Sequence, residues 1–132
     1  AEEQAAREKA LGLLDLVALR RLAEEPARVL SGGQRKLLEL ARVMMADPQV
    51  ILLDEPAAGV NPALLDVLIS QIKEINASGV TFVLIEHNID MVQRLCNRIV
   101  VMAQGSLLCE GRPDEVARDP RVIEAYLGGA AA

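Results

Sequence analysis

Three short apolar runs, each separated from the next by a helical pattern, constrain the fold of this chain more than any other feature. The runs cover residues 50–53, 80–85 and 99–102. A short, continuous apolar run indicates a strand buried on both faces, and strands that alternate with helices pair in parallel through right-handed crossovers. Hydrophobic residues make up 52% of the chain and aromatic residues only 2%, which suits an aliphatic core of helices packed on strands. We therefore predict an α/β fold with a parallel sheet.

Helix signals fill the segments around these runs. Apolar residues recur at helical spacing, and the ends of the helices carry capping residues. The predicted helices are residues 2–17, a helix begun by Ser31 and ended before Pro48, a helix capped by Asn61 and closed by Gly79, and residues 89–95. A polar connection joins the first two helices, and the opening segment is typical of the end of a helical subdomain.

Shorter elements are predicted after the third apolar run. A turn at Gln104 and Gly105 leads from the third apolar run into a strand over residues 106–109. Two short helices follow, one opened by Pro113 and one opened by Pro120 and ending at Gly128.

Charge and cysteine usage exclude several classes of protein. The net charge is −5 and the basic residues are scattered, so the chain lacks the basic patch of a nucleic-acid-binding protein. Cys96 and Cys109 have no metal-site spacing, and we interpret both as reduced, packed thiols. The apolar runs are far shorter than the ~20 residues that cross a bilayer, so we expect membrane association only through another subunit.

Ser31, Gly32, Gly33 and Gln34 form the first stretch that points to chemistry. One interpretation is a capping box, in which Ser31 and Gln34 satisfy the first backbone amides of a helix. The two glycines are then unexplained, since each costs up to ~1 kcal/mol relative to alanine in a helix. They suggest that something approaches the backbone closely, and an anion suits the free amides and the positive end of the helix dipole.

Polar side chains also follow two of the apolar runs. Asp54 and Glu55 come directly after the first run, and His87 follows the second. Two adjacent acids at the carboxyl end of a strand are costly unless they bind a ligand or lie exposed in a crevice. A solvated strand end and an unimportant surface histidine are the alternatives when each signal is taken alone.

Together these stretches resemble the ABC ATPase family. Residues 30–34 read Leu-Ser-Gly-Gly-Gln, which matches the family's signature motif, and the stretch ending in Asp54 and Glu55 resembles its Walker B element. The resemblance implies that residues 31–34 contact the γ-phosphate of ATP held by the opposite subunit of a head-to-tail dimer. It assigns Asp54 to Mg²⁺, through water, Glu55 to polarising the attacking water, and His87 to the switch histidine that contacts the γ-phosphate.

The segment after Walker B corresponds to the D-loop, which links the two composite sites of the dimer in this family. Ala58, Gly59 and Asn61 lie in it, and Asn61 replaces the aspartate of many members. The resemblance also divides the chain into residues 1–48, the end of the helical subdomain with the signature helix, and residues 49–132, the C-terminal half of the RecA-like ATPase core.

The loop that holds the nucleotide phosphates in P-loop ATPases is missing from this sequence. That loop reads G-x-x-x-x-G-K-[ST], whereas the three lysines here follow Glu8, Arg35 and Ile72. In the family, its strand lies between the switch-histidine strand and the strand over residues 99–102. We therefore expect a sheet with a gap, filled by another chain or segment, or a piece that rearranges or self-associates.

The resemblance implies an ATP-hydrolysing subunit, with ATP and Mg²⁺ as ligands and a second ATPase subunit and permease subunits as partners. Residues 54–62 and 122–128 resemble ATPases of branched-chain amino acid importers, with urea or amide importers as an alternative. The expected location is the cytoplasmic face of the plasma membrane. An ABC ATPase of DNA repair or translation, or a non-catalytic fragment, are the competing hypotheses. Without the phosphate loop, we expect this chain alone neither to bind ATP tightly nor to hydrolyse it.

Overall fold

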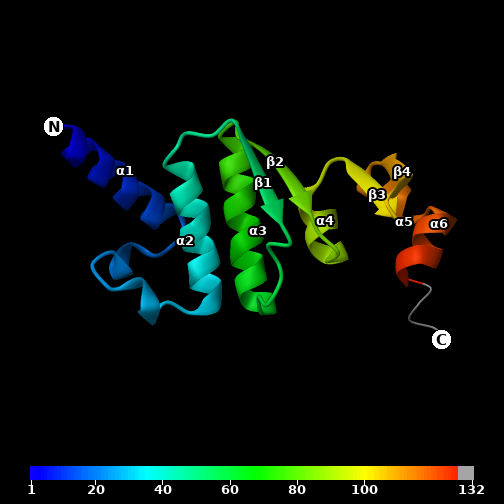
Figure 1. Ribbon diagram of the computed structural model, residues 1–132, viewed down its shortest axis with the longest axis horizontal. Coiled ribbons are helices and arrows are strands. Elements are labelled where there is room, and N and C mark those ends of the chain that lie inside the picture. The colour runs from blue at the N-terminus through cyan, green and yellow to red at the C-terminus, as the bar shows by residue number, and fades with distance from the viewer. Residues whose placement is uncertain (128–132) are drawn as a thin grey trace. The chain divides into compact units, whose positions relative to one another are not determined.

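The chain forms two compact units, Ala1–His87 and a second one that begins at Asn88. A computed structural model describes residues 1–127 (Figure 1). The predicted helix end at Gly128 lies outside the described residues. Among residues 1–127, no helix is both long and apolar enough to cross a membrane.

The first unit follows the predicted order of elements. It contains α1 (Glu2–Leu16), short 3₁₀ turns at Arg20–Leu22 and Ala27–Val29, α2 (Gly32–Met44), β1 (Val50–Asp54), α3 (Pro62–Ala77) and β2 (Thr81–Ile85). Asn61 caps α3 by accepting a 2.9 Å hydrogen bond from the Leu64 amide, and Gly79 follows the helix at φ +111°. Both capping predictions are confirmed.

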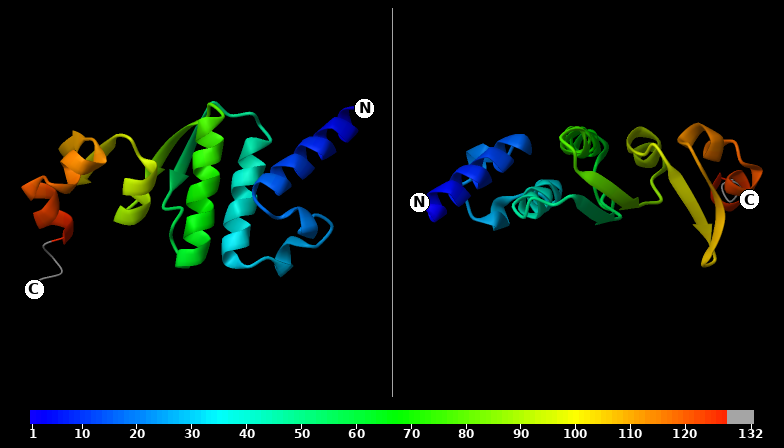
Figure 2. Two further views of the ribbon diagram at one scale, coloured as in Figure 1. Left: turned by 180° about the vertical axis from the view of Figure 1, so that it is seen from behind. Right: turned by 90° about the horizontal axis from the view of Figure 1, so that it is seen from above.

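The two strands of this unit pair in parallel, as predicted. The register joins Ile51 to Phe82 and Asp54 to Ile85. Helix α3 lies against one face of the two strands, as the views from behind and from above in Figure 2 show. On that face Ile51 is buried, and so is the apolar stripe of α3, formed by Leu65, Leu68, Ile69, Ile72 and Ile75.

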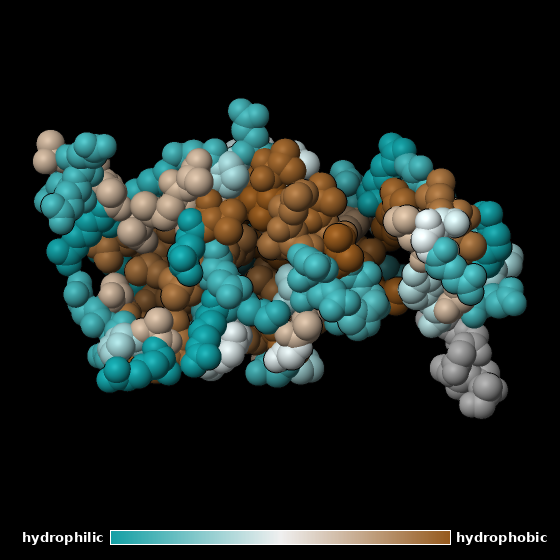
Figure 3. Space-filling view, viewed as in Figure 1, coloured by the Kyte–Doolittle hydropathy of each residue, from teal (hydrophilic) through white to brown (hydrophobic). Residues whose placement is uncertain are grey.

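The opposite face of the strands is open, which corrects the prediction that they are buried on both faces. Val50 is 53% exposed, Leu52 75%, Val83 49% and Ile85 64%. We call these four side chains the open apolar face. Figure 3 shows the apolar surface where the strands face the viewer. The apolar run correctly predicted two packable faces, but within residues 1–127 only one of them is covered.

The second unit is built on a hairpin. It contains α4 (Ile89–Leu95), β3 (Ile99–Ala103), β4 (Ser106–Gly111), α5 (Pro113–Ala117), α6 (Pro120–Val122) and a π-helical turn (Ile123–Leu127). Gln104 and Gly105 both have positive φ, as a two-residue hairpin turn requires. Val101, Val116 and Val122 form its buried cluster.

The third predicted parallel strand behaves differently. In the described part of the chain, β3 pairs with β4 in an antiparallel ladder, and β1 pairs with β2 in a separate sheet. The parallel prediction is therefore confirmed for β1 and β2. In agreement with the expected gap, β3 lies outside their ladder, and the predicted turn at Gln104 and Gly105 pairs it with β4. The antiparallel partner arises because the turn at Gly105 is too short for anything but a hairpin.

The start of α2 explains one of the two adjacent glycines. A Cβ atom on Gly33 would lie 1.3 Å from Leu64 Cδ2 and 2.7 Å from Leu64 Cγ, whereas a Cβ on Gly32 would meet nothing within 4 Å. The close approach inferred from the sequence is therefore, at Gly33, an approach by the Leu64 side chain of α3. Gly32 has no such packing requirement.

This difference gives a stability prediction. Gly33→Ala should lower the free energy of unfolding by about 1–3 kcal/mol, because the Leu64 side chain must shift to admit the methyl group. Gly32→Ala is the matched control and should be neutral or stabilising by up to ~1 kcal/mol. Urea unfolding of the variants measures both values.

A double-mutant cycle tests the cause. In the Leu64→Ala background, Gly33→Ala should cost much less, because the clashing side chain is gone. If Gly33→Ala cost the same in both backgrounds, Leu64 would not be the reason for the glycine.

Candidate functional site

The parallel ladder brings the predicted catalytic residues to one edge of the sheet. Asp54 is the last residue of β1, and the Glu55 amide donates a 2.7 Å hydrogen bond to the Ile85 carbonyl at the end of β2. His87 follows β2 by two residues. Because both strands run in the same direction, their carboxyl ends meet here. We call this edge, formed by Asp54, Glu55, Glu86 and His87, the carboxyl edge.

Glu55 and His87 contact each other across this edge. His87 Nδ1 lies 3.1 Å from Glu55 Oε1, and both side chains are exposed to solvent. The structure therefore joins two residues that are 32 positions apart and that the sequence analysis assigned to one nucleotide site. A carboxylate and an imidazole within hydrogen-bond distance can exchange or orient protons of a bound water.

Glu55 is held in an unusual backbone conformation. Its φ is +47°, in the left-handed region that residues with a Cβ atom rarely adopt. A tight turn follows, in which the Ala58 amide donates to the Glu55 carbonyl at 3.1 Å. Strained residues of this kind cluster at functional sites, where the surrounding structure maintains them. The turn directs the chain away from β1 immediately after the acid.

The turn contains the residues that the sequence analysis placed in the D-loop. Ala58 and Gly59 are exposed, Gly59 has φ +70°, and Asn61 caps α3 through its side-chain oxygen. The capping role explains why an asparagine suits position 61. The Asn61 side chain is thus occupied by the Leu64 amide in this structure.

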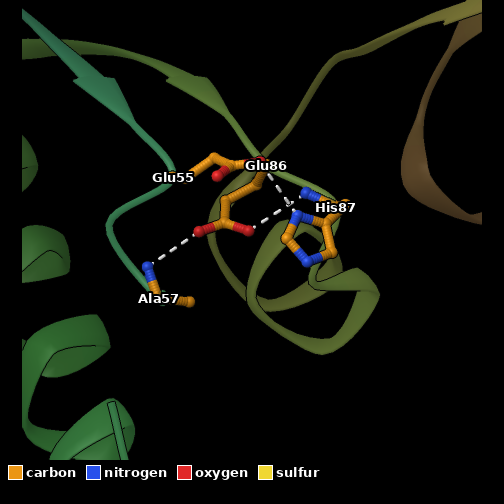
Figure 4. A network of polar contacts seen from close by, with 4 residues as sticks. All are labelled: Glu55, Ala57, Glu86 and His87. Carbon is orange, nitrogen blue, oxygen red and sulfur yellow. Dashed lines mark hydrogen bonds and ion pairs between the residues drawn. The ribbon is translucent and has the colours of Figure 1, made fainter. Parts of the chain in front are cut away.

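Glu86 is a residue of this edge that the sequence analysis missed. Its Oε1 accepts a 2.8 Å hydrogen bond from the Ala57 amide and its Oε2 accepts a 3.0 Å bond from the His87 amide (Figure 4). The available signal was a second acid beside His87, at the end of an apolar strand, but its partner at Ala57 is distant in the sequence.

The signature residues lie at a different place, the N-terminus of α2. Ser31 Oγ accepts a 3.2 Å bond from the Gln34 amide, and Gln34 Oε1 accepts a 2.9 Å bond from the Ser31 amide. The capping box is therefore formed, and it orients both side chains at a helix start. Ser31 and Gly32 are exposed there, whereas Gly33 is buried under Leu64.

No cluster of metal ligands exists among the described residues. Within residues 1–127, no group of three or more His, Cys, Asp or Glu side chains could hold a metal ion. In general Mg²⁺ needs few protein ligands, because one or two carboxylates, water and the phosphates of a nucleotide can complete its coordination.

Comparisons with known proteins agree with the arrangement of these motifs. Residues 1–58 match the family described as "ABC transporter", and residues 106–132 match the family described as "Branched-chain amino acid ATP-binding cassette transporter". A probable LivG protein of Archaeoglobus fulgidus is 42% identical over 96% of this chain and 49% of its own length. BraF of Pseudomonas aeruginosa is 42% identical over 97% of this chain and 51% of its own length.

Solved structures show the same fold. The ATP-binding cassette MJ1267 in its ADP conformation has a TM-score of 0.86 and 39% identity, over 94% of this chain and 50% of that one. CbiO1 of Clostridium perfringens, described as part of the ABC transporter complex cbiONQ, has a TM-score of 0.81 and 28% identity, over 98% of this chain and 53% of that one.

The chain belongs to the family of ABC transporter ATP-binding proteins. Within that family it is LivG/BraF-like, and it spans about half the length of the curated relatives it matches. Proteins of this family typically bind ATP and Mg²⁺. The resemblance deduced from the motifs is thus confirmed.

The strained backbone at Glu55 gives a second stability prediction. Glu55→Gly should be more stable than Glu55→Ala by about 1 kcal/mol, because both variants lose the side chain but only glycine favours a positive φ. Urea unfolding measures the difference.

Ala58 supplies the control within the same turn. It has no positive φ, so Ala58→Gly should be neutral or destabilising. If Glu55→Gly and Glu55→Ala were equally stable, the turn would not hold strain at Glu55.

Proposed function

We propose that this chain supplies half of the ATP-binding subunit of an ABC importer for branched-chain or related amino acids. The observation that carries the proposal is the contact of Glu55 with His87 at the carboxyl edge, beside Asp54. The names of the relatives, branched-chain amino acid transport ATP-binding proteins, support the substrate class. On this proposal the complete subunit couples ATP hydrolysis to solute uptake.

The residues of the carboxyl edge suit the steps of this reaction. Asp54 would hold Mg²⁺ through a bound water, and the cation would supply positive charge to the phosphates. Glu55 polarises the attacking water, and His87 holds the γ-phosphate side of the site. Their 3.1 Å contact lets His87 orient the Glu55 carboxylate toward that water.

The signature residues serve the second composite site of a dimer. Ser31 and Gln34 are oriented by their mutual capping bonds, and the amides at the start of α2 favour an anion. They contact the phosphate of ATP bound by the opposite subunit. Ala58, Gly59 and Asn61 link the two sites, because their turn lies between Glu55 and the start of α3.

The open apolar face supports the proposal that a further part of the ATPase domain packs on this chain. Folded proteins seldom leave four large apolar side chains together on an uncovered sheet, and among residues 1–127 β2 has a ladder partner on one side only. The chain spans about half of its relatives' length. We infer that the other half, which includes the phosphate loop and its strand, covers the open apolar face and pairs beside β2.

The partners and the location follow from the same proposal. A second ATPase subunit completes the two composite sites, and permease subunits provide the path across the membrane. The subunit then lies on the cytoplasmic face of the plasma membrane, attached through the permease.

The open apolar face predicts self-association of this chain in the absence of a covering segment. Sedimentation of the 132-residue chain should show a concentration-dependent rise in mass, and the Leu52→Gln, Ile85→Gln double variant should remain monomeric. Val67→Gln, a change of an exposed apolar residue on α3, is the control and should associate like the unmodified chain. A monomeric unmodified chain that keeps β1 and β2 paired would contradict the inference.

The role of Glu55 predicts a trapped state in the complete subunit. Glu55→Gln should bind Mg·ATP and form a stable dimer while hydrolysis falls by a factor on the order of 10²–10⁴, because the water is no longer polarised. Gel filtration with ATP and phosphate release measure the two effects, and Glu74→Gln on α3 is the control. Normal turnover in Glu55→Gln would sink the assignment.

The 132-residue chain alone tests the assignment of the phosphate loop to the other half. Calorimetric titration with Mg·ATP should show no tight binding. Tight binding by this chain would refute that division.

A further inference from the structure

We propose that Glu86 is a positioning residue. Its carboxylate keeps Glu55 and His87 in contact by accepting hydrogen bonds from the backbone amides of Ala57, in the loop after Glu55, and of His87. The geometry of the two hydrogen bonds does not depend on the proposed function. The expected effect on the rate of ATP hydrolysis rests on it.

The carboxylate of Glu86 joins two separate pieces of backbone. Oε1 accepts from the Ala57 amide, two residues after Glu55, and Oε2 accepts from the amide of His87. Figure 4 shows the carboxylate between the turn after β1 and the chain after β2. Through these two bonds the side chain connects the loop that carries Glu55 with the backbone that carries His87.

This connection lies directly after the end of the ladder between β1 and β2. The last bond of the parallel ladder runs from the Glu55 amide to the Ile85 carbonyl. Beyond that bond, Ala57 and His87 belong to loops. In the described structure, the Glu86 carboxylate links these loops in place of ladder hydrogen bonds. Hydrogen bonds from backbone amides to an ionised carboxylate are stronger than bonds between neutral groups.

We call the two hydrogen bonds of the Glu86 carboxylate the clamp. The clamp also holds Glu55 in its strained backbone conformation. A residue at φ +47° persists only when its surroundings determine it. The ladder bond fixes the Glu55 amide on one side, and the Ala57 bond to Glu86 fixes the turn on the other. Released from Glu86, the turn can relax, and the Glu55 carboxylate can move away from His87.

A carboxylate with the reach of glutamate is needed for both bonds. Glutamine has only one acceptor oxygen, so Glu86→Gln can keep one amide bond and must present an NH₂ group to the other donor. Glu86→Ala loses both bonds. Aspartate keeps two oxygens but is shorter by one methylene, so it is expected to reach only the neighbouring His87 amide.

Glu86 does not itself act on the nucleotide in this proposal. Its carboxylate oxygens are directed at backbone amides, whereas the Glu55 carboxylate contacts His87. Two acids of the carboxyl edge thus have different roles. Glu86 sets the position of the loop, and Glu55 remains available for a water molecule.

The first test uses the 132-residue chain and does not depend on ATP. Amide hydrogen exchange by NMR should show the Ala57 amide exchanging at least about tenfold faster in Glu86→Ala than in the unmodified chain. In Glu86→Gln its rate should lie between those two rates or equal the rate in Glu86→Ala. Glu74→Gln, an exposed acid on α3, is the matched control and should leave the Ala57 rate unchanged. An unchanged Ala57 rate in Glu86→Ala would overturn the clamp. If Glu86→Ala does not fold, the nearly isosteric Glu86→Gln must show faster exchange at Ala57 or at His87.

The second test uses the complete subunit. Glu86→Ala should lower kcat roughly tenfold to a hundredfold per folded protein while KM for ATP changes little, because Glu55 and His87 are displaced whereas the phosphate loop proposed for the other half of the domain is not. Glu86→Gln should fall between Glu86→Ala and the unmodified subunit, and Glu74→Gln should match the unmodified subunit.

The outcomes separate the two proposals. An unmodified subunit that lacks ATPase activity would contradict the proposed function and leave the exchange result as the measure of the clamp. A normal kcat in Glu86→Ala, with an active unmodified subunit, would overturn the positioning role alone.

Discussion

The rest of the first unit depends on the parallel ladder between β1 and β2. Parallel pairing brings the carboxyl ends of both strands to one edge, so Glu55 and His87 can touch although 32 positions separate them. The ladder is short, and its last bond lies at Glu55. Every polar contact that organises the site lies beyond that bond, in loops that must be held by side chains. This is why Glu86, which binds the backbone of both loops, is as important to the geometry as the residues that face solvent.

The sequence predicted the elements whose signals are local. Ser31 and Asn61 mark helix starts because each side chain accepts a bond from an amide three residues later, within the same segment. Gly79 marks a helix end for a similar reason, through its own φ. The carboxyl edge was also predictable, since acids or a histidine directly after an apolar strand can only lie at its carboxyl end. These inferences need no knowledge of how distant segments pack.

The failures have a common physical cause, which is contact between distant segments. The packing reason for the glycine at position 33 was not predictable, because Leu64, which lies where a Cβ atom on residue 33 would be, belongs to the distant helix α3. Glu86 was missed because its partner amide is 29 residues away. The strands were expected to be covered on both faces, because an apolar run reports that a residue can be buried and not that a partner is present.

The open apolar face and the carboxyl edge are connected through Ile85. Side chains at positions 50, 52, 83 and 85 alternate with those packed toward α3, so the same pleat that builds one core leaves the other uncovered. Ile85 belongs to this face, and its carbonyl accepts the last ladder bond from Glu55. A segment that packs on the face would therefore touch the residue whose carbonyl holds the start of the turn after β1. In the proposed subunit, the half that brings the phosphate loop would also fix the edge that must act on the phosphate, so assembly of the sheet and assembly of the site would be one event.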